Sequence, residues 1–196
     1  MFQGIGTKTM EKPAIYFFEK WCQVCKNNEK RLLNKWENAE EYTTLILKGR
    51  KSITKQIAKE LDLEIFYEYY SLDAVFYKKS DIVKNNSKNK TWRTTGGTFL
   101  TRFKIVFEHE NIITGKTGGY QEICHLLVTN SELKILVGYL DEEKQKGCAE
   151  DFHSIIASQD DKKQSILLIL GSLANGSIKW NGYILNYLNY KKIPMI

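Results

Sequence analysis

The hydrophobic periodicity of this chain changes near residue 63 and divides it into a helical part and a strand-rich part. Before this point apolar residues recur every three to four positions, as in Phe18, Trp21 and Cys25, which is the repeat of an amphipathic helix. Ser52 is the expected N-cap of a further helix over 52–61. After this point, residues 64–77 are rich in aromatic and β-branched side chains, which predicts one long strand or two short ones.

The rest of the chain alternates strands with helices. The expected strands are 99–110, 133–139, 165–170 and an antiparallel edge at 178–188, and the expected helices are 120–128 and 142–158. Strands that are separated by a helix lie parallel, joined by right-handed crossovers. The sequence therefore predicts an α/β fold with a mixed central β-sheet flanked by helices. We expect one domain, 1–196, with a helical N-terminal part at 1–62 and an α/β core at 63–196.

Charge and hydropathy limit the partners. The net charge of +6 permits binding to a polyanion such as nucleic acid or anionic lipid, without requiring it. The longest apolar run, Ile166 to Leu170, is too short to cross a bilayer, and no signal peptide is evident at the start of the sequence. We therefore expect a cytoplasmic protein with no membrane partner.

Four cysteines stand at positions 22, 25, 124 and 148, and we expect reduced thiols. Cys22 and Cys25 have the spacing of a zinc-binding pair, but Cys124, His125, Cys148 and His153 do not form a matching second pair. Because Cys25 shares a helical stripe with apolar residues, burial as a small apolar side chain is the favoured interpretation.

The segment 103–111 carries the most informative acids. Side chains alternate along a strand, so Glu108 and Glu110 point to one face together with Lys104 and Val106, whereas His109 points to the other face with Phe103, Ile105 and Phe107. Two carboxylates on one face of an apolar strand repel each other, and burying them without a partner is costly. A divalent cation would resolve both problems.

Asp73 is a third acid in strand-like sequence, where aspartate is uncommon. It precedes Glu108 by 35 residues, which leaves room for two neighbouring strands to bring the two acids together. Oxygen-rich clusters of this kind suit Mg²⁺ or Mn²⁺. In the alternative interpretation, Glu108 and Glu110 face water beside Lys104 and Lys134, and Asp73 is a turn residue.

This order of acids resembles the PD-(D/E)XK nuclease superfamily, which includes many type II restriction endonucleases. The matching residues are Asp73 on one strand, then Glu108-His109-Glu110 on the next, followed by a helix near Gln121 and the strand at 133–139. The family's lysine position is occupied here by Glu110, which is a Glu-x-Glu variant of the motif.

The resemblance implies that Asp73, Glu108 and the backbone carbonyl of His109 hold Mg²⁺ or Mn²⁺, which activates water and stabilises the scissile phosphate. It implies for Glu110 either a further ligand role or the positioning of water. Glu68 and Glu122 are further candidates, and Lys104 is a candidate for charge balance. No residue of the helical part is predicted to be catalytic.

Cations and an aromatic side chain gather in one polar segment and are candidates for contact with DNA phosphates: Lys84, Lys88, Lys90, Trp92 and Arg93. A solvated loop is the alternative interpretation of this segment. The leading functional hypothesis is a Mg²⁺-dependent endonuclease acting on DNA, with a homodimer as a possible assembly. The alternatives are a nuclease-like domain that binds nucleic acid or protein without cutting it, and an unrelated α/β interaction domain.

Overall fold

The computed structural model describes residues 8–83, 99–114, 118–159 and 164–194. The helices are α1 (Lys8–Asn27), α2 (Glu29–Leu33), α3 (Ala39–Leu47), α4 (Ile53–Glu60), α5 (Gly118–Val128) and α6 (Glu142–Ala157). The strands are β1 (Glu64–Tyr69), β2 (Leu72–Tyr77), β3 (Phe103–Glu110), β4 (Ser131–Tyr139), β5 (Ser165–Ala174), β6 (Ser177–Asn186) and β7 (Tyr190–Lys192). A short 3₁₀ turn, Lys79–Asp81, follows β2.

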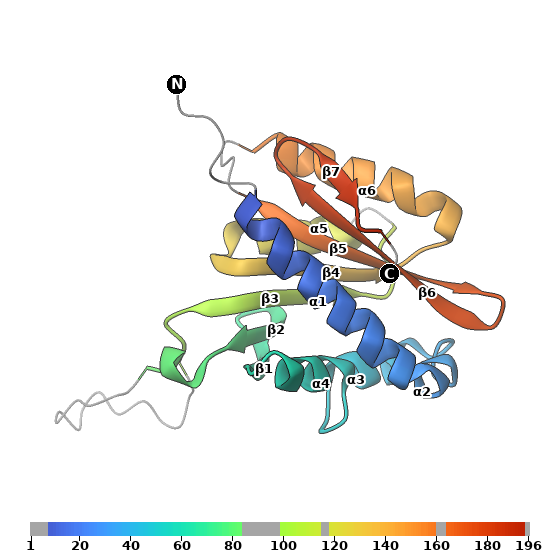
Figure 1. The fold of residues 1–196 in the computed structure, drawn as a ribbon, viewed down its shortest axis with the longest axis horizontal. Helices are drawn as coiled ribbons and strands as arrows, with labels where there is room; N and C mark the ends of the chain where they lie inside the picture. Colours follow the sequence, from blue (N-terminus) through green and yellow to red (C-terminus); the bar gives the residue numbers. More distant parts are fainter. Residues whose placement is uncertain (1–7, 84–98, 115–117, 160–163, 195–196) are drawn as a thin grey trace.

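The strands form one mixed sheet in the order β1-β2-β3-β4-β5-β6-β7 (Figure 1). The pairs β3–β4 and β4–β5 are parallel, with α5 and α6 as their crossover helices, and the other pairs are antiparallel. The predicted α/β class, the mixed sheet and the N-terminal helices are therefore confirmed. Strand β6 is antiparallel as predicted but is not the edge, because the short strand β7 pairs with its outer side.

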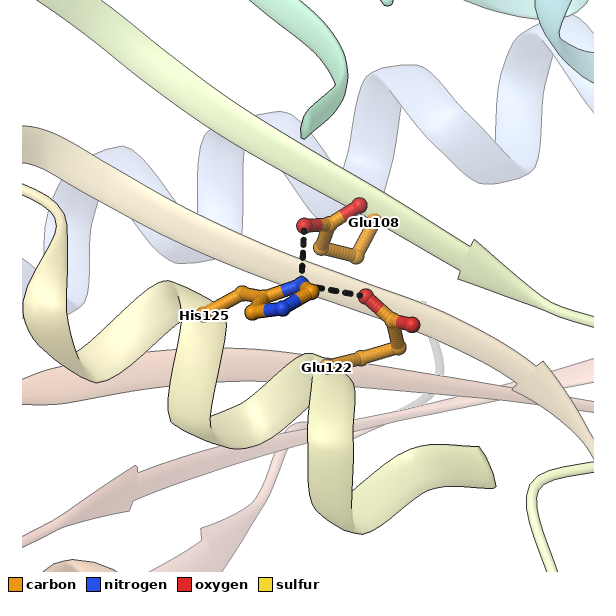
Figure 2. Close-up of side chains that lie close together, drawn as sticks. All are labelled: Glu108, Glu122 and His125. Carbon is orange, nitrogen blue, oxygen red and sulfur yellow. Dashed lines mark ion pairs between the residues drawn. The ribbon is translucent and has the colours of Figure 1, made fainter. Parts of the chain in front are cut away.

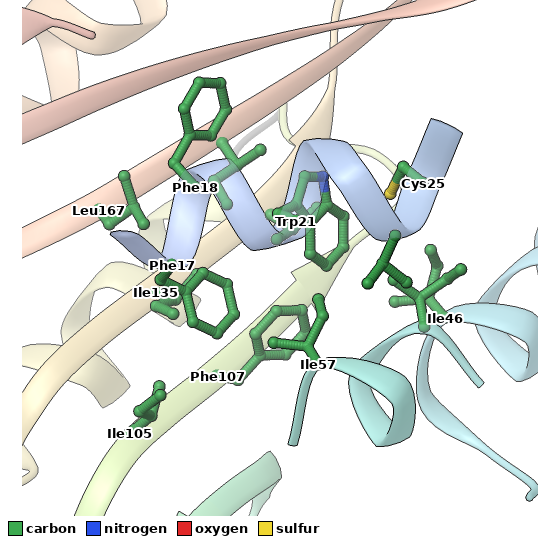
Figure 3. Close-up of a cluster of buried hydrophobic side chains, with 14 of the residues drawn as sticks. Phe17, Phe18, Trp21, Cys25, Ile46, Ile57, Ile105, Phe107, Ile135 and Leu167 are labelled. Atoms are coloured by element: carbon green, nitrogen blue, oxygen red, sulfur yellow. The ribbon is translucent and has the colours of Figure 1, made fainter. Parts of the chain in front are cut away.

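The N-terminal helices cover one face of the sheet (Figure 1). Trp21 of α1 is fully buried and packs on Phe107 of β3, with ring centroids 5.9 Å apart (Figure 3). Its ring also packs on Trp180 of β6, with a centroid distance of 5.1 Å. Cys25 belongs to the same buried cluster, and Cys22 packs against it. Burial raises the pKa of Cys22 to about 12, so these thiols occupy apolar surroundings.

Helices α5 and α6 cover the opposite face, where Val106, Leu136 and Leu168 from three adjacent strands pack beneath Leu126. Phe103 also packs on this side, against Tyr69, which corrects its predicted alignment with Ile105 and Phe107. Among the described residues no helix is both long and apolar enough to cross a membrane.

Ser52 caps α4 as predicted, because its side chain accepts a hydrogen bond from the Lys55 amide. The hairpin between β1 and β2 turns through Tyr70 and Ser71, whose φ values are 50° and 68°. Asp73 is the second residue of β2, after Leu72, so the alternative of a turn residue is not what the structure has.

Candidate metal centre

The antiparallel pairing of β2 with β3 places Asp73 beside Glu108. The register pairs Ala74 with Phe107, so Asp73 and Glu108 are the next residues along the two strands. The Asp73 amide donates to Oε2 of Glu108 at 3.0 Å, and the His109 amide donates to Oδ2 of Asp73 at 2.8 Å. These reciprocal hydrogen bonds hold both carboxylates against the sheet, and the two acids lie together as the strand pattern predicts.

Helix α5 adds two side chains to this group. Glu122 and His125 are three positions apart and therefore lie on one side of the helix, which faces β3 (Figure 2). Nδ1 of His125 lies 3.7 Å from Oε1 of Glu108 and 3.3 Å from Oε2 of Glu122. One ligand atom from each of the three residues lies within 4.8 Å of the others. Glu122 was a secondary candidate from the sequence, whereas His125 had been considered only as a zinc ligand with the cysteines.

Glu108 is the most deeply buried acid of the group. Its side chain is 1% exposed, and its Oε1 has no hydrogen-bond partner among the described residues. Burial raises its pKa to about 9, and the negative charges of Asp73 and Glu122 act in the same direction, whereas the Asp73 amide opposes the shift. A water-facing role for Glu108, which was one alternative, is inconsistent with this burial.

The pKa of Asp73 is raised in the same way, but by less than that of Glu108. Burial raises its pKa to about 6, the hydrogen bond from the His109 amide lowers it, and the charges of Glu122 and Glu110 raise it again. Lys48, at the C-terminal end of α3, lowers this pKa through its positive charge. The helical part of the chain, from which no catalytic residue was predicted, thus supplies a cation that acts on Asp73.

Glu110 lies at the end of β3, outside the tightest group. Its Oε1 accepts a hydrogen bond from the Ile112 amide at 2.8 Å, and its carboxyl carbon lies close to Gly118 at the start of α5. Its charge reaches Asp73, as the raised pKa of Asp73 indicates. Glu110 therefore stands at the rim of the centre, next to the chain that enters α5.

Three further charged residues named in the sequence analysis form interactions outside the acidic group. Glu68 forms an ion pair with Lys48 at 2.8 Å, and Lys104 pairs with Glu132 on β4. Lys134 donates to the carbonyl of Leu127 at the end of α5.

The His109 ring is buried and lies 2.8 Å from the Tyr139 hydroxyl, and burial lowers the pKa of this histidine to about 3. The ligand role of the His109 carbonyl stays a prediction. The five candidates for DNA contact, Lys84, Lys88, Lys90, Trp92 and Arg93, lie outside the described residues.

The donor set fits a divalent cation. Asp73, Glu108 and Glu122 offer carboxylate oxygens and His125 offers an imidazole nitrogen, and both types bind divalent metal ions. Glu108 Oε1 and His125 Nδ1 are both buried polar atoms without a hydrogen-bond partner in the described chain, although such atoms are normally satisfied. A cation between them would satisfy both and would neutralise the neighbouring carboxylates.

Fold and site together define an α/β protein with a carboxylate-rich candidate metal centre where two strands and a crossover helix meet. In comparisons with known proteins, no family model, no curated protein and no solved structure matches the chain.

Proposed function

We propose that this chain is a divalent-metal-dependent endonuclease that hydrolyses phosphodiester bonds of DNA, similar to type II restriction enzymes of the PD-(D/E)XK superfamily. The observation that carries the proposal is the meeting of Asp73 and Glu108 from adjacent strands, with Glu122 above them on the following helix. The resemblance implies Asp73 on one strand and Glu108 on the next, followed by a helix, and Glu122 was a further candidate. The proposal also includes a cytoplasmic location and action as a two-fold dimer.

In the mechanism, Asp73 and Glu108 hold Mg²⁺ or Mn²⁺, and their hydrogen bonds to backbone amides fix the directions of both carboxylates. When bound, such an ion lowers the pKa of a water molecule and stabilises the charge that develops on the scissile phosphate. Glu110, at the rim, accepts a hydrogen bond from the attacking water and orients it. The positive charge of Lys48 acts on Asp73, whereas the family's lysine position is occupied by Glu110.

A basic surface around α3 and α4 supports a polyanionic substrate. Two surface pockets there share Arg50, and their linings combine basic side chains with the acids Glu40, Glu41, Asp62 and Glu64. Among the described residues, Arg50, Lys51 and Lys55 form no ion pair with an acid, so their charges are available to phosphates. Lys48 lines one of these pockets and also acts on Asp73, which connects the basic surface with the acids.

The test is cleavage of supercoiled plasmid DNA by the purified chain with Mg²⁺, with Mn²⁺ and with a chelator. We expect cleavage only with a metal ion, and a loss of at least about a hundredfold in Asp73→Asn and Glu108→Gln. Glu132→Gln is the matched control, because Glu132 is an exposed strand glutamate that pairs with Lys104 away from the centre. Cleavage by Asp73→Asn at the rate of the unchanged protein would refute the proposal.

The second candidate function is binding of nucleic acid without cleavage, and the presence of Glu110 at the family's lysine position favours it. This candidate predicts that DNA is retarded in a gel but stays intact with every metal ion tested. Analytical ultracentrifugation with and without a DNA duplex tests the predicted dimer in either case.

A further inference from the structure

We propose that Glu108, Glu122 and His125 form a cation position with a nitrogen ligand, which makes the centre prefer Mn²⁺ to Mg²⁺. This inference rests on the proposed function, because the ion concerned is the one that the nuclease would use. Its ligand set, however, is one that the nuclease resemblance does not supply. It adds His125 as a direct metal ligand and assigns the choice of ion to helix α5.

The first observation is that two buried polar atoms face each other without a hydrogen bond. Oε1 of Glu108 and Nδ1 of His125 each lack a hydrogen-bond partner in the described chain, and 3.7 Å separates them (Figure 2). The other oxygen of Glu108 is fixed by the Asp73 amide, so Oε1 is held toward the helix. A buried carboxylate oxygen and a ring nitrogen that face each other without hydrogen bonds are both able to bind a positive ion.

The second observation is the spacing of the donor atoms. Ligands about 2.1 Å from a common ion lie roughly 3.0 to 3.4 Å apart in octahedral or tetrahedral geometry. Nδ1 of His125 lies 3.3 Å from Oε2 of Glu122 and 3.7 Å from Oε1 of Glu108. The first distance falls in that range, and the second reaches it with a small side-chain movement.

The third step concerns the type of ion. Mg²⁺ selects oxygen ligands and keeps several water molecules, whereas an imidazole nitrogen binds transition-metal ions more readily. Mn²⁺ accepts both donor types, so one nitrogen among carboxylates raises the affinity for Mn²⁺ much more than the affinity for Mg²⁺. A neutral imidazole can carry its proton on Nε2, and in that tautomer Nδ1 of His125 is free to bind the ion.

An ion pair between protonated His125 and Glu122 is the competing explanation of the same geometry. In that case the ring nitrogen would carry a proton toward the carboxylates, and the histidine would leave metal binding unchanged. The two explanations therefore differ in whether His125 touches the ion, which can be measured without any cleavage assay.

The experiment measures binding of Mn²⁺ and of Mg²⁺ to the metal-free full chain by titration calorimetry, together with pulsed electron paramagnetic resonance of the Mn²⁺ complex. We expect Mn²⁺ to bind at least about tenfold more tightly than Mg²⁺, with nitrogen coupling from one imidazole in the resonance spectrum. His125→Gln should lose this coupling and weaken Mn²⁺ binding about tenfold or more, with little change for Mg²⁺. His153→Gln is the matched control, because His153 lies on α6 beside Tyr190 and outside the cluster.

The spectrum of the unchanged protein decides the matter even if His125→Gln fails to fold. Nitrogen coupling supports the inference, and a Mn²⁺ complex with oxygen ligands alone overturns it, as does equal affinity for the two ions. A chain that binds Mn²⁺ through nitrogen but leaves DNA intact would refute the nuclease proposal and leave this inference standing. A chain that cuts DNA equally well with either ion and without His125 would refute this inference and leave the nuclease proposal standing.

Discussion

Replacement of Glu108 by glutamine should stabilise the metal-free protein at neutral pH. Glutamine keeps the shape of the side chain and the oxygen that accepts the Asp73 amide, but unlike glutamate it cannot ionise in the unfolded chain. Burial and the neighbouring acids raise the pKa of Glu108 from 4.5 to about 9. The folded protein therefore holds a proton that the unfolded chain releases above pH 4.5, and stability falls as the pH rises toward 9.

The size of the destabilisation follows from the interval between the ordinary pKa of 4.5 and the pH of the measurement. Each pH unit between 4.5 and 7 costs about 1.4 kcal/mol, so the carboxyl group destabilises the metal-free fold by about 3 kcal/mol at pH 7. At pH 5 the same cost is below about 1 kcal/mol. Glu108→Gln should therefore raise the free energy of unfolding by about 3 kcal/mol at pH 7 and by much less at pH 5.

Urea unfolding in the presence of a chelator, at pH 5 and at pH 7, measures this difference. Glu132→Gln serves as the control, because loss of an exposed ion pair changes stability by less than about 1 kcal/mol. Mn²⁺ at a hundredfold excess over its dissociation constant should stabilise the unchanged protein by about 2.7 kcal/mol and the glutamine variant hardly at all. An equal increase in the free energy of unfolding at both pH values, or a decrease at pH 7, would show that the pKa of Glu108 is not raised as described.

Three further predictions test the fold and the basic surface. Gly138→Ala should destabilise the protein by about 1–3 kcal/mol in urea unfolding, because the new methyl group would crowd the whole Ile113 side chain and lie 3.0 Å from its Cβ; unchanged stability would contradict this packing. Trp21→Ala should cost about 3–5 kcal/mol by the same measurement, since the side chain is fully buried, and a cost below about 1 kcal/mol would contradict its place in the core. Arg50→Glu combined with Lys51→Glu should weaken DNA binding about tenfold or more at low salt and reduce the salt dependence, measured by fluorescence anisotropy; unchanged affinity would remove these side chains from the proposed path of the DNA.

The sequence predicted the sheet and its helices because both periodicities are strong along this chain. It also placed Asp73 beside Glu108, since two antiparallel strands joined by a long connection return to the same point. Short strands and helices contain too few residues to show either periodicity. Strand β7 has three residues, too few for an alternating pattern, so β6 was assigned to the sheet edge.

His125 and Lys48 could not be found in the same way. The position of His125 depends on where α5 crosses β3, and a helical repeat indicates which residues share a side without fixing what that side faces. Its spacing from Glu122, three positions along a predicted helix, was the only signal in the sequence. Lys48 follows a helix that the periodicity assigned to the core alone, and its proximity to Asp73 arises only when α3 packs beside the β1–β2 hairpin.

The charges of the centre determine the order in which its ligands can enter. Asp73, Glu108, Glu110 and Glu122 influence one another electrostatically, and Lys48 is the cation that lowers the pKa of Asp73. A phosphate group that approached these carboxylates alone would meet like charge in surroundings that screen it poorly. A divalent ion reverses the local sign and also satisfies the buried oxygen of Glu108. In the proposed reaction, the basic surface around α3 and α4 would attract DNA with or without the ion, whereas the scissile phosphate would reach the acids only after the ion is in place.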